Sequence, residues 1–150
     1  MSKSVVNIEH KPVLGPEQVI GVTDMVAKIN ALPVTWKKVK VTDVYYYAPS
    51  WDGWRKAIDY EQPKLPKYYA DKFDCENFAG WFRHKIAEDF GINTYAEVEG
   101  WADFQDGRGS QRHGWGVFTD GQYFYQTETQ SGIIMDIDDK FYIPDEITMG

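Results

Sequence analysis

The residues of this sequence best suited to chemistry are one cysteine, one histidine and one glutamate. Cys75 follows Asp74, a residue type that caps helices, so the thiol is expected in the first turn of a helix. There the unpaired backbone N–H groups and the positive end of the helix dipole favour the thiolate, the nucleophilic form of cysteine. A lone cysteine on an apolar helix face is also commonly a small buried hydrophobe, so Cys75 alone leaves both interpretations open.

A predicted β-hairpin brings the histidine and the glutamate together. Asp120-Gly121 lies between two runs rich in aromatic and β-branched residues, His113–Thr119 and Gln122–Thr129, and this dipeptide favours a two-residue turn. In that register His113 is directly opposite Glu128 on the same face of the sheet. With Cβ atoms about 4.5 to 5.5 Å apart, the carboxylate orients one imidazole nitrogen and leaves the other for a nucleophile. Together with the cysteine, the pattern predicts a Cys-His-Glu catalytic triad.

Two further residues on these strands extend the prediction. Gln126 lies diagonal to His113 on the same face and is the reserve orienter. Trp115 shares the strand face of His113, where it either walls a substrate cleft or packs in the core. Both residues therefore belong to the expected site or its support.

Helices are expected before residue 91 and strands after it. The clearest helix spans Cys75–Phe90, because apolar side chains recur with a period of 3.6 residues and Gly91 follows as a stop signal. A second helix is expected over 16–31, and a short one near 54–60. The expected strands cover 95–101, 113–119, 122–129 and 133–137. This order predicts one α+β domain over 1–150, with N-terminal helices packed on an antiparallel sheet and 1–14 irregular.

Three short motifs carry a resemblance to known enzymes. D-C-E-N-F-A at 74–79, H-G-W-G-V at 113–117 and Y-F-Y-Q-T-E-T-Q at 123–130 resemble the papain-like and transglutaminase-like cysteine hydrolases, over roughly residues 60–140. Within that group, the motifs resemble the small papain-like protease domain of fungal agglutinins and related phage-encoded proteins. The resemblance implies Cys75 as nucleophile, His113 as general base and Glu128 as orienter. It implies cleavage or transfer of an amide bond through an acyl-enzyme, with a peptide, protein or cell-wall peptide as substrate.

The oxyanion hole departs from this family pattern. Papain-type enzymes have a Gln six residues before the nucleophile, and Tyr69 stands there in this sequence. The backbone N–H of Cys75 is one candidate donor, and Tyr69, Lys72 or Gln18 is a candidate for the second. The departure leaves open a hydrolase-like fold without turnover.

Acidic residues near the cysteine suggest a cation. Asp74 and Glu76 flank Cys75, and their negative charge opposes the thiolate. A Ca2+ ion held by carboxylate oxygens would offset that charge. The proposed ligands are Asp74, Glu76, Asp136 and Asp138, with Asp139, Glu97, Glu99 and Asp103 nearby. A solvated acidic hairpin end is the alternative, and the sequence requires no other cofactor.

Composition limits the partners. The chain has 16 basic and 23 acidic side chains, a net charge of −7, which argues against nucleic-acid binding. No apolar run of about 18 residues and no leader pattern are found, so neither a membrane span nor a secretory signal is expected. Aromatic residues gather between Tyr45 and Phe73. They support an alternative function, a glycan- or peptide-binding module in which Cys75 is only a packing residue.

Overall fold

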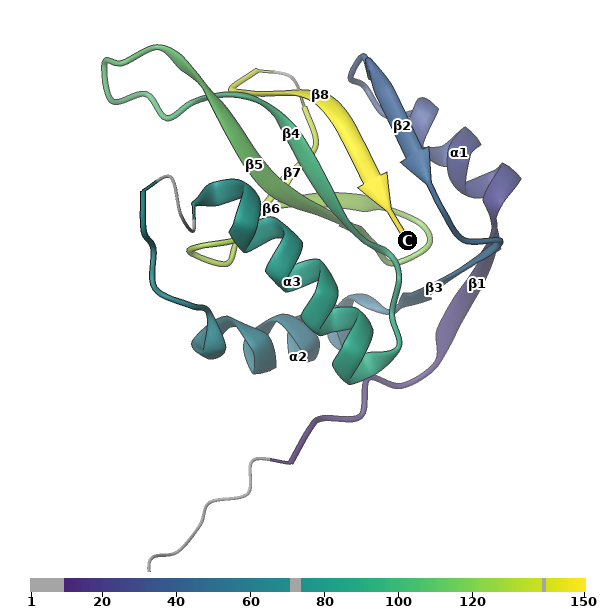
Figure 1. Cartoon of the computed structure of the whole chain (residues 1–150). Coiled ribbons are helices and arrows are strands. Elements are labelled where there is room, and N and C mark those ends of the chain that lie inside the picture. Colours follow the sequence, from purple (N-terminus) through teal and green to yellow (C-terminus); the bar gives the residue numbers. More distant parts are fainter. Residues whose placement is uncertain (1–9, 71–73, 139) are drawn as a thin grey trace, which may run out of the picture.

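The computed structural model describes residues 10–70, 74–138 and 140–150. Within them, eight strands, three α-helices and one 3-10 turn follow one another along the chain (Figure 1). Their bounds are β1 Glu17–Gly21, α1 Val22–Asn30, β2 Lys38–Val41, β3 Tyr45–Pro49, α2 Trp51–Glu61, η1 Gln62–Lys64, α3 Cys75–Phe90, β4 Tyr95–Asp103, β5 Ser110–Thr119, β6 Phe124–Glu128, β7 Ile133–Asp136 and β8 Tyr142–Met149.

A six-stranded sheet in the order β2-β8-β4-β5-β6-β7 forms the centre of the molecule. Helices α2 and α3 cover one of its faces and α1 lies on the other (Figure 1). Side chains alternate between the faces along each strand, so β5 sends Val117 into the α1 core and Phe118 into the α2–α3 core. Both faces of the central strands are therefore buried.

The expected α+β fold with N-terminal helices is wrong. The described chain is mostly β-sheet, and residues 17–21 form β1, an edge partner of β3, where the helix over 16–31 was expected. The helix begins only at Val22. The β-branched residues Val19 and Ile20 enter the strand because β3 supplies backbone hydrogen-bond partners for them, which local periodicity does not reveal. Strands β2 and β8 were also missed, and they pair in parallel, so the sheet is not purely antiparallel.

The turn between β5 and β6 is longer than predicted. Asp120 accepts hydrogen bonds at its Oδ1 from the backbone N–H of Gln122, at 2.9 Å, and of Tyr123, at 2.7 Å. The side chain thereby holds a four-residue loop, and the strands pair Thr119 with Phe124 rather than with Gln122. The register is shifted by two residues. A shift by an even number leaves every side chain on its expected face.

Helix α3 spans Cys75–Phe90, as expected. Asp74 and Asn77 form a reciprocal capping box, in which the Asn77 side chain accepts the Asp74 backbone N–H at 3.1 Å. At the other end Gly91 adopts a left-handed conformation with φ of 67°, which a residue with a Cβ disfavours. These two ends fix the position of the thiol at the helix start.

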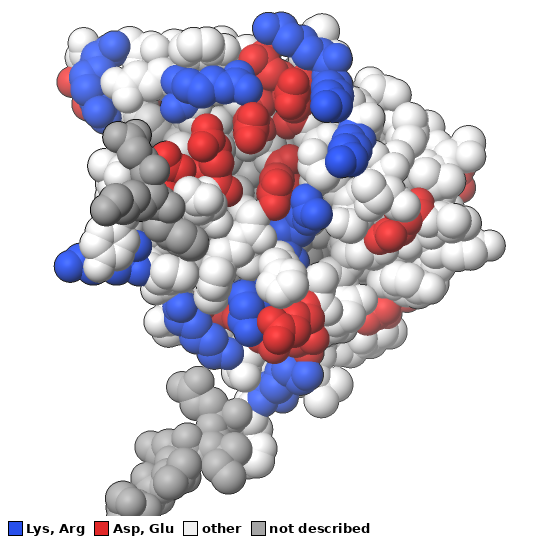
Figure 2. All heavy atoms as spheres, in the orientation of Figure 1, with Lys and Arg blue, Asp and Glu red and all other residues white. Residues whose placement is uncertain are grey.

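Charges of both signs lie beside one another on the surface. Figure 2 shows acidic side chains gathered over the middle of one face with Lys and Arg around them. One such contact joins Arg83 of α3 to Glu97 of β4 at 3.4 Å. This ion pair links a cation of the helix layer to an anion of the central sheet. None of the described helices is long and apolar enough to cross a membrane.

Candidate functional site

Three elements meet at the predicted nucleophile. Cys75 opens α3, His113 lies in β5 and Glu128 ends β6. The Nε2 atom of His113 is 3.1 Å from Oε1 and 2.9 Å from Oε2 of Glu128. An ionised carboxylate only accepts hydrogen bonds, so we assign the hydrogen to Nε2. Nδ1, the other ring nitrogen, is then the one that the carboxylate does not hold.

The environment of His113 favours its charged form. The residue is 7% exposed, and burial by itself lowers the pKa of the ring. Hydrogen bonding to the Cys75 side chain, hydrogen bonding to Glu128 and the negative charges of both outweigh burial and raise the pKa to about 9. At neutral pH the ring is therefore mostly protonated, with the Cys75 side chain on one side and the Glu128 carboxylate on the other.

Cys75 and His113 line a hollow of about 340 Å³ that is open to solvent. Its lining residues are Tyr68, Cys75, Phe104, Arg108, Gln111, Arg112, His113 and Gln130. The two arginines are already paired, Arg108 with Asp106 and Arg112 with Asp145 at 2.8 Å. Their charges are thus largely compensated before any ligand enters.

The other predicted site residues lie elsewhere or are already engaged. Tyr69 is exposed, with Lys67 Nζ 5.8 Å from its ring centre, and its neighbour Tyr68 lines the hollow instead. Gln126 donates to the backbone carbonyl of Asp136 at 2.9 Å, so its amide does not orient His113. Lys72 lies outside the described residues.

Trp115 is fully buried and belongs to the α1-side core. Its ring also stacks on the imidazole of His113, with centroids 5.9 Å apart and planes 20° apart. Of the two interpretations, core packing holds: Trp115 lies against the histidine ring inside the core and is not among the residues that line the hollow at Cys75.

The predicted calcium ligands are not gathered into one site. Asp74 and Glu76 lie at the start of α3, whereas Asp136 ends β7 and Asp138 follows it. Among the residues that the structure describes, no three His, Cys, Asp or Glu side chains are grouped so as to hold a metal ion. Asp139 lies outside that set.

Two further residues at the site were not predicted from the sequence. Tyr142 donates its hydroxyl hydrogen to Glu128 Oε2 at 2.9 Å. Phe104 presents its ring to His113 edge-on, with centroids 4.9 Å apart at 83°. Neither has a local signal of function. The apolar residues between Tyr142 and Met149 are compatible with a strand. That pattern could have indicated the strand on which Tyr142 lies.

The aromatic residues between Tyr45 and Phe73 divide into two groups. Tyr46 and Trp54 are fully buried, whereas Trp51 is 38% exposed. Trp51 packs against Tyr125 at a centroid distance of 4.7 Å and borders an open hollow of about 660 Å³. The other lining residues are Arg55, Tyr125, Gly132, Ile133, Ile134, Met135 and Asp136. Phe73 lies outside the described residues.

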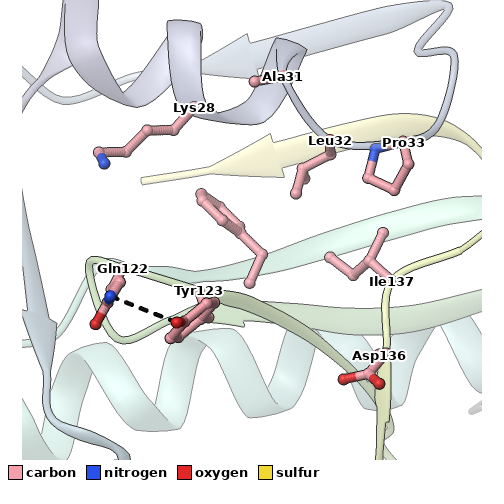
Figure 3. A pocket seen from close by; sticks show the side chains of 9 residues that line it. Lys28, Ala31, Leu32, Pro33, Gln122, Tyr123, Asp136 and Ile137 are labelled. Carbon is pink, nitrogen blue, oxygen red and sulfur yellow. Dashed lines mark hydrogen bonds between the residues drawn. The ribbon is translucent and has the colours of Figure 1, made fainter.

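A third hollow, of about 390 Å³, lies between the end of α1 and the β5–β6 loop (Figure 3). The Tyr123 ring is 57% exposed there, and Gln122 donates to its hydroxyl at 3.5 Å. Leu32, Pro33 and Ile137 form the apolar part of its wall. This hollow, the one at Trp51 and the one at Cys75 are thus each lined by an exposed aromatic side chain.

Solved structures resemble this fold. The structure described as the PSL1a-E64 complex matches 87% of this chain and 51% of its own chain, with a TM-score of 0.66 and 19% sequence identity. A Polyporus squamosus lectin bound to the human-type influenza-binding epitope Neu5Aca2-6Galb1-4GlcNAc matches 78% of this chain and 45% of its own, with a TM-score of 0.56 and 19% identity. This chain therefore spans about half the length of the proteins that it resembles.

These findings correct the family resemblance drawn from the short motifs. No protein-family model and no curated protein matches the sequence. The similar structures are those of a Polyporus squamosus lectin, so assignment to the papain-like or transglutaminase-like hydrolases is wrong. The classification as a cysteine (thiol) protease with a catalytic triad is wrong with it. At 19% identity the similarity shows the fold alone.

Proposed function

We propose that this chain is a glycan-binding module. Its fold resembles that of a Polyporus squamosus lectin, and one of the similar structures holds a sialylated trisaccharide. The observation that carries the proposal for this chain is the exposed Trp51 ring at the edge of the 660 Å³ hollow. The proteins compared are about twice as long, so the position of the site is argued from this chain's own residues.

The Trp51 hollow has the chemistry that a sugar ring needs. The C–H face of a pyranose packs on an aromatic ring, because the electron-rich face of the ring attracts the partly positive hydrogens. Tyr125 holds Trp51 from the side. Arg55 and Asp136 border the same hollow and offer donors and acceptors to sugar hydroxyls. The ion pair of Arg55 with Asp59, 3.4 Å long and exposed, is weak enough to be exchanged for a ligand.

A glycan array followed by calorimetry tests this proposal. Trp51→Ala is expected to weaken binding of the selected glycan about fivefold or more, since a lost stacking contact is typically worth about 1 kcal/mol. Tyr123→Ala is the matched control, because it removes another exposed ring from the hollow of Figure 3. Equal loss in both variants would contradict the assignment to Trp51, and no binding to any glycan would contradict the function.

The Cys75 site supports a second candidate function, a reactive thiol. The supporting observation is the hydrogen bond between His113 and Glu128 beside Cys75, in a hollow open to solvent. The His113 imidazolium would stabilise the Cys75 thiolate, which would then react with an electrophile. Glu128 would keep the ring oriented throughout. The substrate proposed from the sequence, an amide of a peptide or protein, stays a prediction.

The rate of cysteine alkylation tests the second candidate. Near pH 6, iodoacetamide is expected to modify Cys75 faster than free cysteine, and His113→Ala should abolish the difference. His84→Ala is the matched control, since His84 lies exposed on α3. E64, the compound in the PSL1a complex, is a second probe: intact mass spectrometry shows whether it becomes attached at Cys75. Slow alkylation that is independent of His113 would contradict a reactive thiol.

A further inference from the structure

The carboxylate of Glu128 is held from two directions. Its Oε2 accepts one hydrogen bond from His113 Nε2 and one from the Tyr142 hydroxyl, each 2.9 Å long. The Glu128 side chain is 17% exposed, so solvent reaches it poorly. Strand β8 thus contributes a donor to a contact between β5 and β6.

The Tyr142 hydroxyl is protonated at neutral pH and can donate a hydrogen bond. Burial, followed by the negative charge of Glu128 and the hydrogen bond to it, raises the pKa of Tyr142 far above its ordinary value. The phenol therefore keeps its hydrogen, and Glu128 receives it as a charge-assisted hydrogen bond.

The ring of Tyr142 is itself fixed by aromatic contacts. It meets Trp115 edge-on, with centroids 5.2 Å apart at 80°, and Phe104 at 6.2 Å and 90°. It lies 6.1 Å from the His113 ring at 60°. Because these rings restrict the motion of the Tyr142 side chain, its hydroxyl stays in place as a hydrogen-bond donor to the Glu128 carboxylate.

We infer that Tyr142 is a positioning residue that orients the Glu128 carboxylate toward Nε2 of His113 and so leaves Nδ1 for Cys75. The inference rests on the second candidate function, the reactive thiol. Tyr142 acts through Glu128 and takes no part in bond formation. Removing its hydroxyl frees the carboxylate to rotate, so the imidazole is oriented for a smaller fraction of the time.

Tyr142→Phe removes the hydroxyl and keeps the ring. The rate of Cys75 alkylation by iodoacetamide is expected to fall about tenfold at pH 7, because one buried hydrogen bond to a charged group is lost. The acid limb of the pH–rate profile should also move to higher pH, because a less ordered imidazolium supports the thiolate less well. A merely structural role would lower the melting temperature and leave this limb in place.

A double variant tests whether Tyr142 acts through Glu128. If it does, Glu128→Gln combined with Tyr142→Phe should alkylate no more slowly than Glu128→Gln alone. Tyr46→Phe is the matched control, since its buried hydroxyl contacts Asp43 and Met149 instead.

The possible failures are separable. Slow, His113-independent alkylation in the unsubstituted protein would overturn the reactive thiol and this inference with it. Fast, His113-dependent alkylation with an unchanged profile in Tyr142→Phe would overturn only the role of Tyr142, as would additive losses in the double variant.

Discussion

His113 and Glu128 are hydrogen-bonded without being cross-strand partners. The β5–β6 ladder pairs Val117 with Gln126, and continuing that register places Gln130, not Glu128, opposite the histidine. The 2.9 Å contact therefore runs diagonally across the two strands. Diagonal Cβ atoms are about 7 to 8 Å apart, a span that an imidazole and a glutamate side chain bridge together.

The first prediction concerns the charge on this diagonal. Glu128→Gln removes the negative charge but keeps the shape, so the pKa of His113 should fall from about 9 by at least about one unit. A pH titration followed by NMR of the His113 ring protons measures it. Glu88→Gln, an exposed carboxylate that contacts Lys85, is the control and should leave His113 unchanged. An unshifted His113 in Glu128→Gln would show that the carboxylate does not govern its charge.

The second prediction follows from the sign of that shift. His113 has a higher pKa in the folded chain than the ordinary value of 6.5, so the folded state binds more protons between these limits. Its contribution to the free energy of unfolding is complete below about pH 6.5 and is lost as pH rises through about 9. Urea denaturation at pH 6 and pH 10 should show a larger fall for the unsubstituted protein than for His113→Gln. Equal falls in both proteins would contradict the prediction.

The third prediction concerns Glu61, which is fully buried at the end of α2. Burial, then the neighbouring carboxyl group of Asp89 and its negative charge, raise the pKa of Glu61 to about 7. The unfolded chain gives up this proton near pH 4.5, so the folded state loses stability as pH rises from about 4.5 to about 7. Glu61→Gln should therefore raise the melting temperature at pH 8 by about 3 °C or more.

Calorimetry at two pH values checks this result. Glu61→Gln should differ from the unsubstituted protein much less at pH 4 than at pH 8. The matched control is Glu17→Gln, an exposed carboxylate in β1, for which no such dependence is expected. A destabilised Glu61→Gln protein at pH 8 would show that the charged carboxylate is needed there.

The fourth prediction tests the contact between β5 and Tyr95. A Cβ at Gly116 would overlap the Tyr95 hydroxyl oxygen, and Tyr95 is fully buried in the α2–α3 core. Gly116→Ala should destabilise the fold by about 2 kcal/mol or more, because the tightly packed Tyr95 ring cannot move away from the new methyl group without disturbing its neighbours. Gly21→Ala, where a Cβ meets nothing within 4 Å, should cost less than about 1 kcal/mol. Urea denaturation measures the free energy of unfolding of both variants. A similar loss of stability in the two would contradict the proposed clash.

The sequence alone determined the elements whose signals are local. Helix α3 has its expected bounds, since its apolar period, capping residues and terminal Gly91 lie within one stretch of chain. It also determined that His113 and Glu128 share a face. Side chains alternate between the two faces of a strand, so an error of two residues in the predicted register still leaves His113 and Glu128 on the same face.

Only the tertiary structure decided what depends on distant partners. The strand at 17–21 needed β3 beside it, and the parallel pair of β2 and β8 joins segments about a hundred residues apart. Tyr142 contacts Glu128, and Phe104 contacts His113, because the sheet brings separate strands and loops side by side. The short motifs also misled the choice of family, because residue types at a site recur on different folds. Local sequence patterns encode backbone conformation, whereas pairing between remote strands depends on the packing of the whole chain.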